Sequence, residues 1–166
     1  MFTNNVGSVG NLSDVRKNAD QSIKIALASK ADAIHLWSIK QDIWHHERVV
    51  THSWETDKEK IYNSFDVLVF MSELETFGLV VIEAMSAGIP CMLSDIPVFK
   101  QFEQCPGVVI IDAVKETYAP EILNELLANK AELSHEMFHY FDKTYSEKAI
   151  FSKWNELIHD TLAHDK

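Results

Sequence analysis

Short apolar runs alternate with amphipathic segments through residues 1–112, and this alternation limits the possible folds more than any other feature of the sequence. The runs are apolar and often β-branched, and they lack the in-and-out alternation of half-exposed strands. Such runs are typical of strands that are buried on both faces of a parallel sheet. They lie at residues 33–37, 48–51, 66–71, 90–93 and 108–111.

The segments between these runs predict helices. One helix is expected from an N-cap at Ser13 or Asp14 to about Lys30, and two more are expected over residues 56–65 and 78–87. Strands that alternate with helices in this order favour a parallel sheet with right-handed crossovers. The predicted fold is α/β, a doubly wound parallel (Rossmann-like) sheet of about six strands with C-terminal helices.

The last third of the chain predicts helices alone, over residues 120–129, 132–141 and 146–163. We expect these C-terminal helices to pack back over the sheet. A length of 166 residues suits one domain, so residues 1–166 are predicted to form a single domain. A chain of this size can bury a core that needs no disulfide or metal.

The chain is acidic, with a formal net charge of −10 from 25 acidic and 15 basic residues. A nucleic-acid binder needs a basic face and an interfacial membrane helix needs a Lys/Arg stripe, so the charge argues against both. Cys91 and Cys105 follow no metal spacing and are too few for a disulfide scaffold, which favours a reducing compartment. The N-terminus lacks the pattern of a secretory signal, and no run approaches the ~20 apolar residues of a spanning helix. We expect a soluble, cytoplasmic protein.

The segment over residues 70–90 is the most informative for chemistry. Glu75 lies in a loop after a predicted strand, and Glu83 lies eight residues later inside a predicted helix. Ligands of such sheets bind beyond the carboxyl ends of the strands, where helix N-termini present unpaired N–H groups. A rise of 1.5 Å per residue puts the two carboxylates roughly 10–12 Å apart at most. That separation is too wide for two carboxylates that share a proton, and it suits two ends of one elongated ligand.

This segment resembles the E-x7-E signature of retaining GT-B glycosyltransferases of the GT4 type (glycosyl transferases group 1), written E-G-F-G-L-x-x-x-E-A-M-A-x-G-x-P. The residues before it, Ile61 and Tyr62 followed by 65–67, resemble the Y-x-x-A-D-V run of that family, and residues 94–99 resemble the segment after it. The resemblance extends from about Val6 to the last predicted helix. It implies that the chain is the C-terminal, donor-binding domain of such an enzyme.

The resemblance also implies roles for individual residues. Glu83 takes the position that accepts hydrogen bonds from the two ribose hydroxyls of the donor, and Glu75 takes the catalytic position over the transferred sugar, facing the developing oxocarbenium charge. Further donor-binding positions fall at the start of the helix, where amides can receive sugar or phosphate oxygens and a glycine allows close approach. These positions are Thr76, Phe77, Gly78 and Leu79.

A cation for the donor diphosphate is expected near the first strand. The family pattern G-R-x5-K-G places its lysine at Lys17, but its arginine position holds Asn11. An amide does not replace a guanidinium that neutralises a leaving diphosphate, and Arg16, next to Lys17, is the candidate to compensate. A second departure is Gln101, which stands where the family has an acid. Trp54 either stacks on the nucleotide base or covers the domain edge.

Simpler interpretations of the same residues remain open. Ser72 and Glu75 form an S-x-x-E pattern, so Glu75 could cap a helix, and Glu83 could be a solvated residue on an exposed helix face. Lys17 and Arg16 could each be solvated surface residues.

Residues 135–139 read H-E-x-x-H on a predicted helix, which is the zincin pattern, with His135 and His139 as ligands and Glu136 as general base. A catalytic zinc needs a third protein ligand, and the pattern lies far along the chain from the residues above, so zinc chemistry is disfavoured and no metal site is assigned. Gly7 and Gly10 do not complete a G-x-G-x-x-G fingerprint, which disfavours a dinucleotide cofactor.

The resemblance implies a metal-independent hexosyltransferase of polysaccharide or lipid glycosylation, with a nucleotide diphosphate sugar as donor substrate and no cofactor. The glycan or lipid acceptor is expected to bind an N-terminal domain that this chain lacks, so turnover by the chain alone is expected to be near zero. Exposed apolar cleft surface is expected to favour self-association. The alternative function is a non-catalytic GT-B-like interaction module that has lost part of the site.

Overall fold

The computed structural model describes residues 3–40, 44–112 and 115–164, and these residues form one parallel sheet of six strands. The strand order is β3-β2-β1-β4-β5-β6, which places the first and fourth strands side by side at the centre. This is the doubly wound order, and it confirms the predicted fold class. The strands are β1 (Asn5–Val9), β2 (Ala33–Trp37), β3 (Val49–His52), β4 (Val67–Phe70), β5 (Cys91–Ser94) and β6 (Val108–Ile111).

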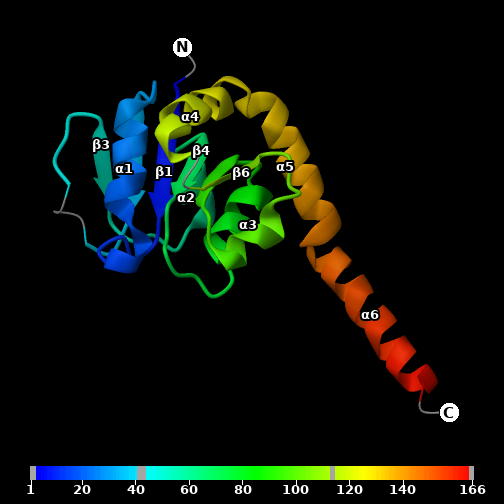
Figure 1. The fold of residues 1–166 in the computed structure, drawn as a ribbon. Helices are drawn as coiled ribbons and strands as arrows, with labels where there is room; N and C mark the ends of the chain where they lie inside the picture. Colours follow the sequence, from blue (N-terminus) through cyan, green and yellow to red (C-terminus); the bar gives the residue numbers. More distant parts are fainter. Residues whose placement is uncertain (1–2, 41–43, 113–114, 165–166) are drawn as a thin grey trace.

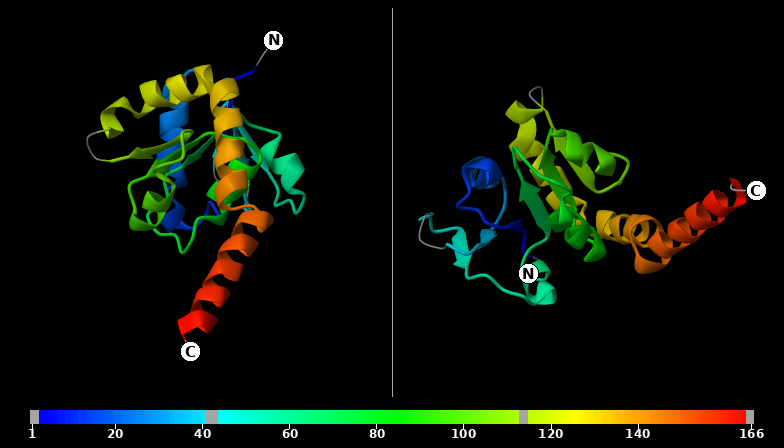
Figure 2. Two further views of the ribbon diagram at one scale, coloured as in Figure 1. Left: turned by 90° about the vertical axis from the view of Figure 1, so that its right-hand side faces the viewer. Right: turned by 90° about the horizontal axis from the view of Figure 1, so that it is seen from below.

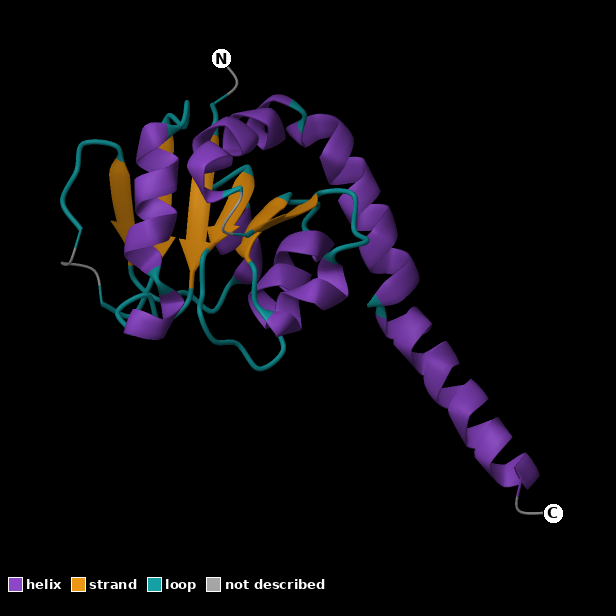
Figure 3. Cartoon of the chain, viewed as in Figure 1, coloured by secondary structure: helices purple, strands orange, loops and turns teal. Residues whose placement is uncertain are grey.

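Helices cover both faces of the sheet, so the strands are apolar on both sides (Figures 1 and 3). On one face Ile23 of α1 and Leu123 of α4 join a buried apolar cluster with Val67 and Val69 of β4. On the other face the cluster includes residues from α2, α3 and α5. The helices are α1 (Ala19–Ala28), α2 (Lys58–Tyr62), α3 (Leu79–Ser86), α4 (Ala119–Ala128), α5 (Lys130–Thr144) and α6 (Glu147–His164).

The single helix predicted from residues 13–14 to about 30 is wrong, because the chain makes two elements there. Asp14 accepts a hydrogen bond from the backbone N–H of Arg16 and starts a short 3-10 helix, η1 (Val15–Lys17). Asn18 then adopts the left-handed conformation, with φ 47° and ψ 45°, and α1 begins after it. Asparagine tolerates this conformation better than most residues, so the break separates Lys17 from the helix that was expected to carry it.

The prediction that the C-terminal helices pack back over the sheet is right for α4 and α5 and wrong for α6. Met137 of α5 is fully buried in the core beside Phe102 and Cys105. Helix α6 instead projects away from the layered domain, as both views of Figure 2 show. Two further 3-10 helices, η2 (Pro97–Phe102) and η3 (Glu116–Tyr118), connect strands and helices.

In the part of the chain that the structure describes, no helix combines the length and the hydropathy needed to cross a membrane.

Candidate functional site

A pocket of about 210 Å³ lies between the segment after β1 and the segment after β4, at the carboxyl edge of the sheet. It brings together four of the residues expected at the donor site, Arg16 and Lys17 from η1 and Glu75 and Thr76 from the loop before α3. These residues are separated by about sixty positions in the sequence and meet because β1 and β4 are neighbours. Asp14 and Leu74 complete the lining.

Backbone hydrogen bonds hold these two segments together. The carbonyl of Arg16 accepts a 2.7 Å bond from the backbone N–H of Glu73 and a 3.1 Å bond from the hydroxyl of Ser72. The same hydroxyl also lies 3.1 Å from the carbonyl of Leu74. The Ser72 hydroxyl is therefore bonded to backbone carbonyls, and α3 begins only at Leu79 with Gly78 as its N-cap, so the interpretation of Ser72 and Glu75 as a capping box is wrong.

Lys17 and Glu75 form an ion pair at the centre of the pocket, between Nζ of Lys17 and Oε1 of Glu75. The side chains are 21% and 13% exposed, so both charges are largely withdrawn from water. The ammonium also lies over the ring of Phe70, 5.5 Å from its centroid. A lysine solvated at the surface would have neither this ion pair nor this ring contact, so the interpretation of Lys17 as a solvated residue is wrong.

Arg16 lines the same pocket, but its guanidinium is paired with a neighbouring carboxylate, that of Asp14. Its guanidinium makes hydrogen bonds of 3.0 Å and 3.2 Å from Nε, and 2.6 Å from Nη2, to the carboxylate of Asp14. These hydrogen bonds lower the pKa of Asp14 to about 2. The pocket thus holds two cations and two carboxylates, and each cation already has an anionic partner.

The N-terminus of α3 follows directly after this pocket. Gly78 begins it with φ 87°, a left-handed conformation that L side chains rarely adopt. A Cβ at this position would lie 3.2 Å from the ring of Phe99 and 3.1 Å from that of Phe102. Because a glycine N-cap has no side chain to offer, the first amides of α3 are left to bind other acceptors. Phe77 and Leu79, on either side, are exposed.

Glu83 lies one turn and a half into α3, in a separate cluster that does not line the Lys17 pocket. Its carboxylate accepts a 2.7 Å hydrogen bond from the hydroxyl of Tyr62 and pairs with Nζ of Lys58 at 3.0 Å. The Glu83 side chain is only 31% exposed, so the interpretation as a merely solvated residue is wrong. Burial and, to a lesser extent, the hydrogen bond to Glu83 raise the pKa of Tyr62 well above its usual range.

Lys58 is a site residue that the sequence reasoning missed. Asp57 accepts hydrogen bonds from the backbone N–H groups of Glu59 and Lys60 and so begins α2, which places Lys58 in the first turn. The Lys58 ammonium lies 5.7 Å from the ring centroid of Trp54, an exposed residue, as well as against Glu83. The cap signal could have located the helix start, but no local spacing links Lys58 to a residue 25 positions away.

The two departures from the family pattern have different structural consequences. Asn11 is exposed, and its side-chain oxygen accepts a 2.8 Å hydrogen bond from the hydroxyl of Ser13. Gln101 donates through Nε2 to the backbone carbonyls of Phe77, at 3.1 Å, and Val98, at 2.8 Å. An acid at this position would have no proton to donate at neutral pH, so the amide supports the loop before α3 in a way that a carboxylate cannot.

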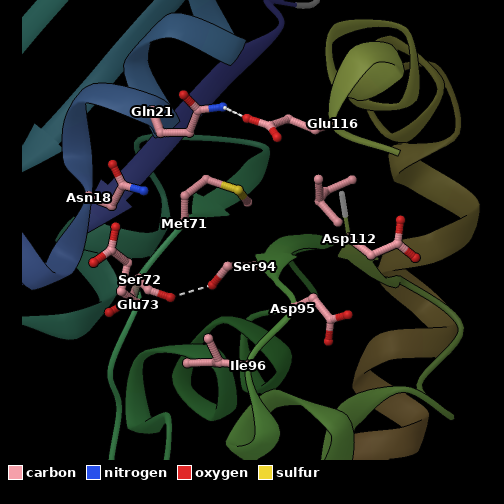
Figure 4. A pocket seen from close by; sticks show the side chains of 11 residues that line it. Asn18, Gln21, Met71, Ser72, Glu73, Ser94, Asp95, Ile96, Asp112 and Glu116 are labelled. Carbon is pink, nitrogen blue, oxygen red and sulfur yellow. Dashed lines mark hydrogen bonds between the residues drawn. The ribbon is translucent and has the colours of Figure 1, made fainter. Parts of the chain in front are cut away.

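A larger pocket of about 350 Å³ lies beside these clusters, beyond the carboxyl ends of β4, β5 and β6 (Figure 4). Gln21 and Glu116 close one side of it through a 3.0 Å hydrogen bond. Four acidic side chains line it, one of them, Asp95, paired with Lys100 at 2.7 Å, and its described lining includes neither Lys nor Arg, so the Lys17 pocket is the better place for phosphate. The sequence analysis missed this pocket, although three of its acids follow strands that end at the same edge; the four are Glu73, Asp95, Asp112 and Glu116.

The H-E-x-x-H residues lie on α5, in a surface pocket of about 440 Å³. His135 and His139 line this pocket together with Glu136. Across residues 3–40, 44–112 and 115–164, no group of three or more His, Cys, Asp or Glu residues is arranged to hold a metal ion. The pattern thus lacks the third ligand that catalytic zinc requires.

A family model described as "Glycosyl transferases group 1" matches residues 7–144, which include both the Lys17 pocket and the Glu83 cluster. The chain belongs to the glycosyl transferases group 1 family. The resemblance of the E-x7-E segment to the glycosyl transferases group 1 family is thereby confirmed. The match covers most of the chain, and it ends before α6.

Curated relatives of this group 1 chain are named as glycosyltransferases. The O-antigen biosynthesis glycosyltransferase WclY of Escherichia coli is 25% identical over 116 residues, covering 69% of this chain and 32% of the relative. The GtfA subunit of the UDP-N-acetylglucosamine–peptide N-acetylglucosaminyltransferase of Streptococcus pneumoniae is 27% identical over 116 residues, covering 64% and 23%. The chain therefore spans only about a quarter to a third of the length of these relatives.

Solved structures agree with the fold of this group 1 chain. TarM of S. aureus, in a complex with fondaparinux, α-GlcNAc-glycerol and UDP, superposes with a TM-score of 0.78 at 22% identity and covers 95% of this chain and 36% of its own. HepE of Anabaena, in a complex with UDP and glucose, gives a TM-score of 0.75 at 16% identity and covers 98% and 48%. At these identities the likeness supports the architecture alone.

Proposed function

We propose that this chain is the donor-binding domain of a retaining GT4-type glycosyltransferase, which transfers a hexose from a nucleotide diphosphate sugar to a glycan or lipid acceptor. The observation that carries the proposal is the ion pair of Lys17 and Glu75 in a pocket at the carboxyl edge of the sheet. A lysine for the diphosphate and a carboxylate for the sugar are the two charges that such a donor needs at its reacting end.

The charge balance of the pocket suggests how a donor binds. Because Glu75 already neutralises Lys17, a diphosphate must take the place of the carboxylate as partner of the ammonium. The exchange releases Glu75 toward the sugar and exposes it to the positive charge that develops when the sugar leaves the diphosphate. Arg16 contributes less to diphosphate binding in this proposal, because its guanidinium is already paired with the carboxylate of Asp14.

The α3 helix supplies the second half of the proposed donor site. The amides after Thr76, at Phe77, Gly78 and Leu79, are suited to sugar or phosphate oxygens at the positive end of the helix dipole. Glu83 is suited to accept hydrogen bonds from the ribose hydroxyls, with Tyr62 and Lys58 fixing its carboxylate. Lys58 competes with the ribose for Glu83, so it must share the carboxylate or move when the donor binds.

The acceptor is proposed to bind a partner domain outside residues 1–166. Support comes from the share of the relatives that the chain covers, 36% for TarM and 48% for HepE. The described residues contain the proposed diphosphate pocket and the proposed ribose cluster, both of which serve the donor. The chain by itself is expected to bind donor with turnover near zero.

Isothermal titration with UDP, GDP and a panel of their sugar derivatives tests the proposal. One donor is expected to bind, and Lys17→Ala and Glu83→Ala are each expected to weaken it roughly tenfold or more, which corresponds to about 1.4 kcal/mol. Lys60→Ala is the matched control, because Lys60 pairs with Glu55 outside the pocket. The proposal is overturned if no donor binds, or if wild type and both site variants bind a donor equally well.

A second candidate is a non-catalytic interaction module that keeps the sheet and has lost the donor site. Asn11 and Gln101 favour it, since neither carries the charge that the family places there. The half-buried pair of Lys17 and Glu75 opposes it, because two charges that are partly withdrawn from water carry a desolvation cost that a module without a donor site would not need to bear. Donor binding of ordinary affinity, with transfer restored by an added acceptor domain, would exclude this candidate.

A further inference from the structure

Two histidines on α5 have no part in the proposed donor site. His135 and His139 line the surface pocket of about 440 Å³, together with Gln104 and Pro106 from the segment before β6. This pocket shares no residue with the pocket that holds the ion pair of the donor site. A ligand bound between the two histidines would therefore occupy a second site on the domain.

The rotation of α5 about its axis is fixed by the buried residue between the two histidines. Met137 is fully buried in the core, and a Cβ at Gly107 would overlap its side chain, so α5 lies close against the chain at the start of β6. At 3.6 residues per turn, the positions two before and two after Met137 lie on the opposite side of the helix. His135 and His139 are both exposed there. The core thus holds both imidazoles on one outward face.

The spacing of the two histidines is that of a chelate. Residues four apart lie one above the other on a helix, with about 5–6 Å between their Cβ atoms. Imidazoles at two such positions can bind one metal ion together, as the same spacing does in the zincin pattern. Within residues 3–40, 44–112 and 115–164, neither the His135 nor the His139 imidazole has a hydrogen-bond or ion-pair partner. Both rings are therefore free to act as ligands.

Imidazole nitrogens select the class of metal. They suit zinc, copper and nickel, whereas calcium and magnesium take oxygen ligands. The formal net charge of −10 and the Glu136 carboxylate in the same pocket favour a cation, while Lys143, one turn beyond His139, opposes it. In the described part of the chain no group of three or more His, Cys, Asp or Glu could hold a metal ion. Two imidazoles are thus the protein ligands, and water takes the remaining positions.

We propose that His135 and His139 form a two-histidine site on α5 for a divalent zinc or copper ion. The bound ion bridges one turn of the helix across its exposed face. Two protein ligands are fewer than the three of catalytic zinc sites, so the site binds the ion without the hydrolytic chemistry of the zincin pattern. The assignment uses none of the donor-site residues and stands independently of the proposed function.

Titration with zinc chloride tests the proposal directly. The chain, carrying no affinity tag and dialysed first against a chelator, is expected to bind one zinc ion in titration calorimetry. His135→Gln and His139→Gln are each expected to weaken zinc binding roughly tenfold or more. His159→Gln, at an exposed histidine of α6, is the matched control and is expected to bind zinc as wild type does. Absence of zinc binding, or equal binding by wild type and both site variants, overturns the proposal.

Substitution of Glu136 separates a two-histidine site from one that also uses the carboxylate. Adjacent residues of a helix do not face each other, so Glu136→Gln is expected to keep one zinc ion per chain. Loss of zinc binding in Glu136→Gln would make the carboxylate a ligand and overturn the assignment to two histidines.

Lys143 separates a cation site from an anion site in the same pocket. Lys143→Ala is expected to tighten zinc binding, because it removes a positive charge one turn from His139. Titration with inorganic phosphate is the companion measurement, and no binding at this pocket is expected. Phosphate binding that Lys143→Ala abolishes, in place of zinc binding, would assign the pocket to an anion and overturn the proposal.

Copper and urea give two further readouts. With one equivalent of Cu²⁺, electron paramagnetic resonance of the wild type is expected to show coupling to imidazole nitrogens that the combined variant His135→Gln, His139→Gln lacks. Zinc is expected to raise the urea midpoint of the wild type and not that of the combined variant, because the ion binds the folded helix. The same copper spectrum, or the same zinc shift, in wild type and combined variant overturns the proposal.

Discussion

The Lys17 ammonium and the Glu75 carboxylate come from segments 58 positions apart and meet in one pocket, where each is the ionic partner of the other. The pair joins the segment after β1 to the segment after β4. Any anion that binds Lys17 must compete with Glu75, and any change at Glu75 alters the charge available to the anion. Affinity for a diphosphate and freedom of the carboxylate are therefore coupled in this pocket.

Glu75→Gln is expected to increase the affinity for free UDP, by up to roughly tenfold, because the neutral amide no longer competes for Lys17. The measurement is titration calorimetry with UDP at low ionic strength, where screening is weak. Arg16→Ala is the comparison variant, and it is expected to weaken UDP binding less than Lys17→Ala does, since Asp14 already neutralises Arg16. Loss of UDP binding in Glu75→Gln would show that the carboxylate holds the pocket open instead of competing with the ligand.

Much of the fold and half of the site could be predicted because they depend on local patterns. Apolar runs without alternation indicate buried parallel strands, and residues at the ends of β1 and β4 converge because those strands are neighbours. The break at Asn18 was not predicted, because a single left-handed residue inside an amphipathic stretch leaves the hydrophobic pattern intact. The contact of Lys58 with Glu83 depends on how α2 packs against α3, and no spacing along the chain records it.

The projection of α6 was missed for a related reason. Its apolar stripe has the period of a helix that packs on its own domain, and the sequence contains no mark that separates a face meant for the domain from a face meant for another partner. In the structure Met137 of α5 is buried in the core, whereas the side chains of α6 from Phe151 to Leu162 are all exposed.

Tyr62→Phe is expected to lower the free energy of unfolding by about 1 kcal/mol. It removes a 2.7 Å hydrogen bond to a charged acceptor, and Glu83 keeps its second partner, Lys58, which limits the loss. Urea unfolding followed by circular dichroism measures the change. Tyr118→Phe, at an exposed tyrosine, is the control and is expected to be neutral. An equal effect of the two substitutions would show that the bond between Tyr62 and Glu83 contributes nothing.

Gly78→Ala is expected to destabilise the domain by about 1–2 kcal/mol, the usual cost of holding an L residue in the left-handed region. The added methyl group also presses on the rings of Phe99 and Phe102, at 3.2 Å and 3.1 Å. Donor binding is expected to weaken as well, because the first amides of α3 shift. Leu79→Ala, at a side chain that is 63% exposed, serves as the neighbouring control. A urea midpoint of unfolding that is the same for Gly78→Ala and for wild type would contradict the expectation.

The unfolding free energy is expected to fall as the pH drops below about 6.5, because of a histidine pair between β2 and β3. Nδ1 of His35 lies 2.9 Å from Nε2 of His52, and the His52 ring stacks on Trp37 with 4.0 Å between centroids. Burial lowers the pKa of both residues; the charge of the other histidine lowers that of His35 further while Asp66 raises it, and Lys60 lowers that of His52. A second proton between the two rings would set two N–H groups against each other.

The direction of this pH dependence is set by which state, folded or unfolded, binds protons at the higher pH. The unfolded histidines take up protons near pH 6.5, whereas the lowered pKa values of the folded pair delay its protonation to more acidic pH, so acidification favours the unfolded chain. We expect a loss of about 1 kcal/mol between about pH 6.5 and pH 5, after allowance for solvent screening of these half-buried rings. Urea unfolding at a series of pH values measures it. His35→Gln combined with His52→Gln should flatten the slope, whereas His139→Gln, at an exposed histidine, should leave it unchanged. A slope that persists in the double variant would assign the pH dependence to other groups.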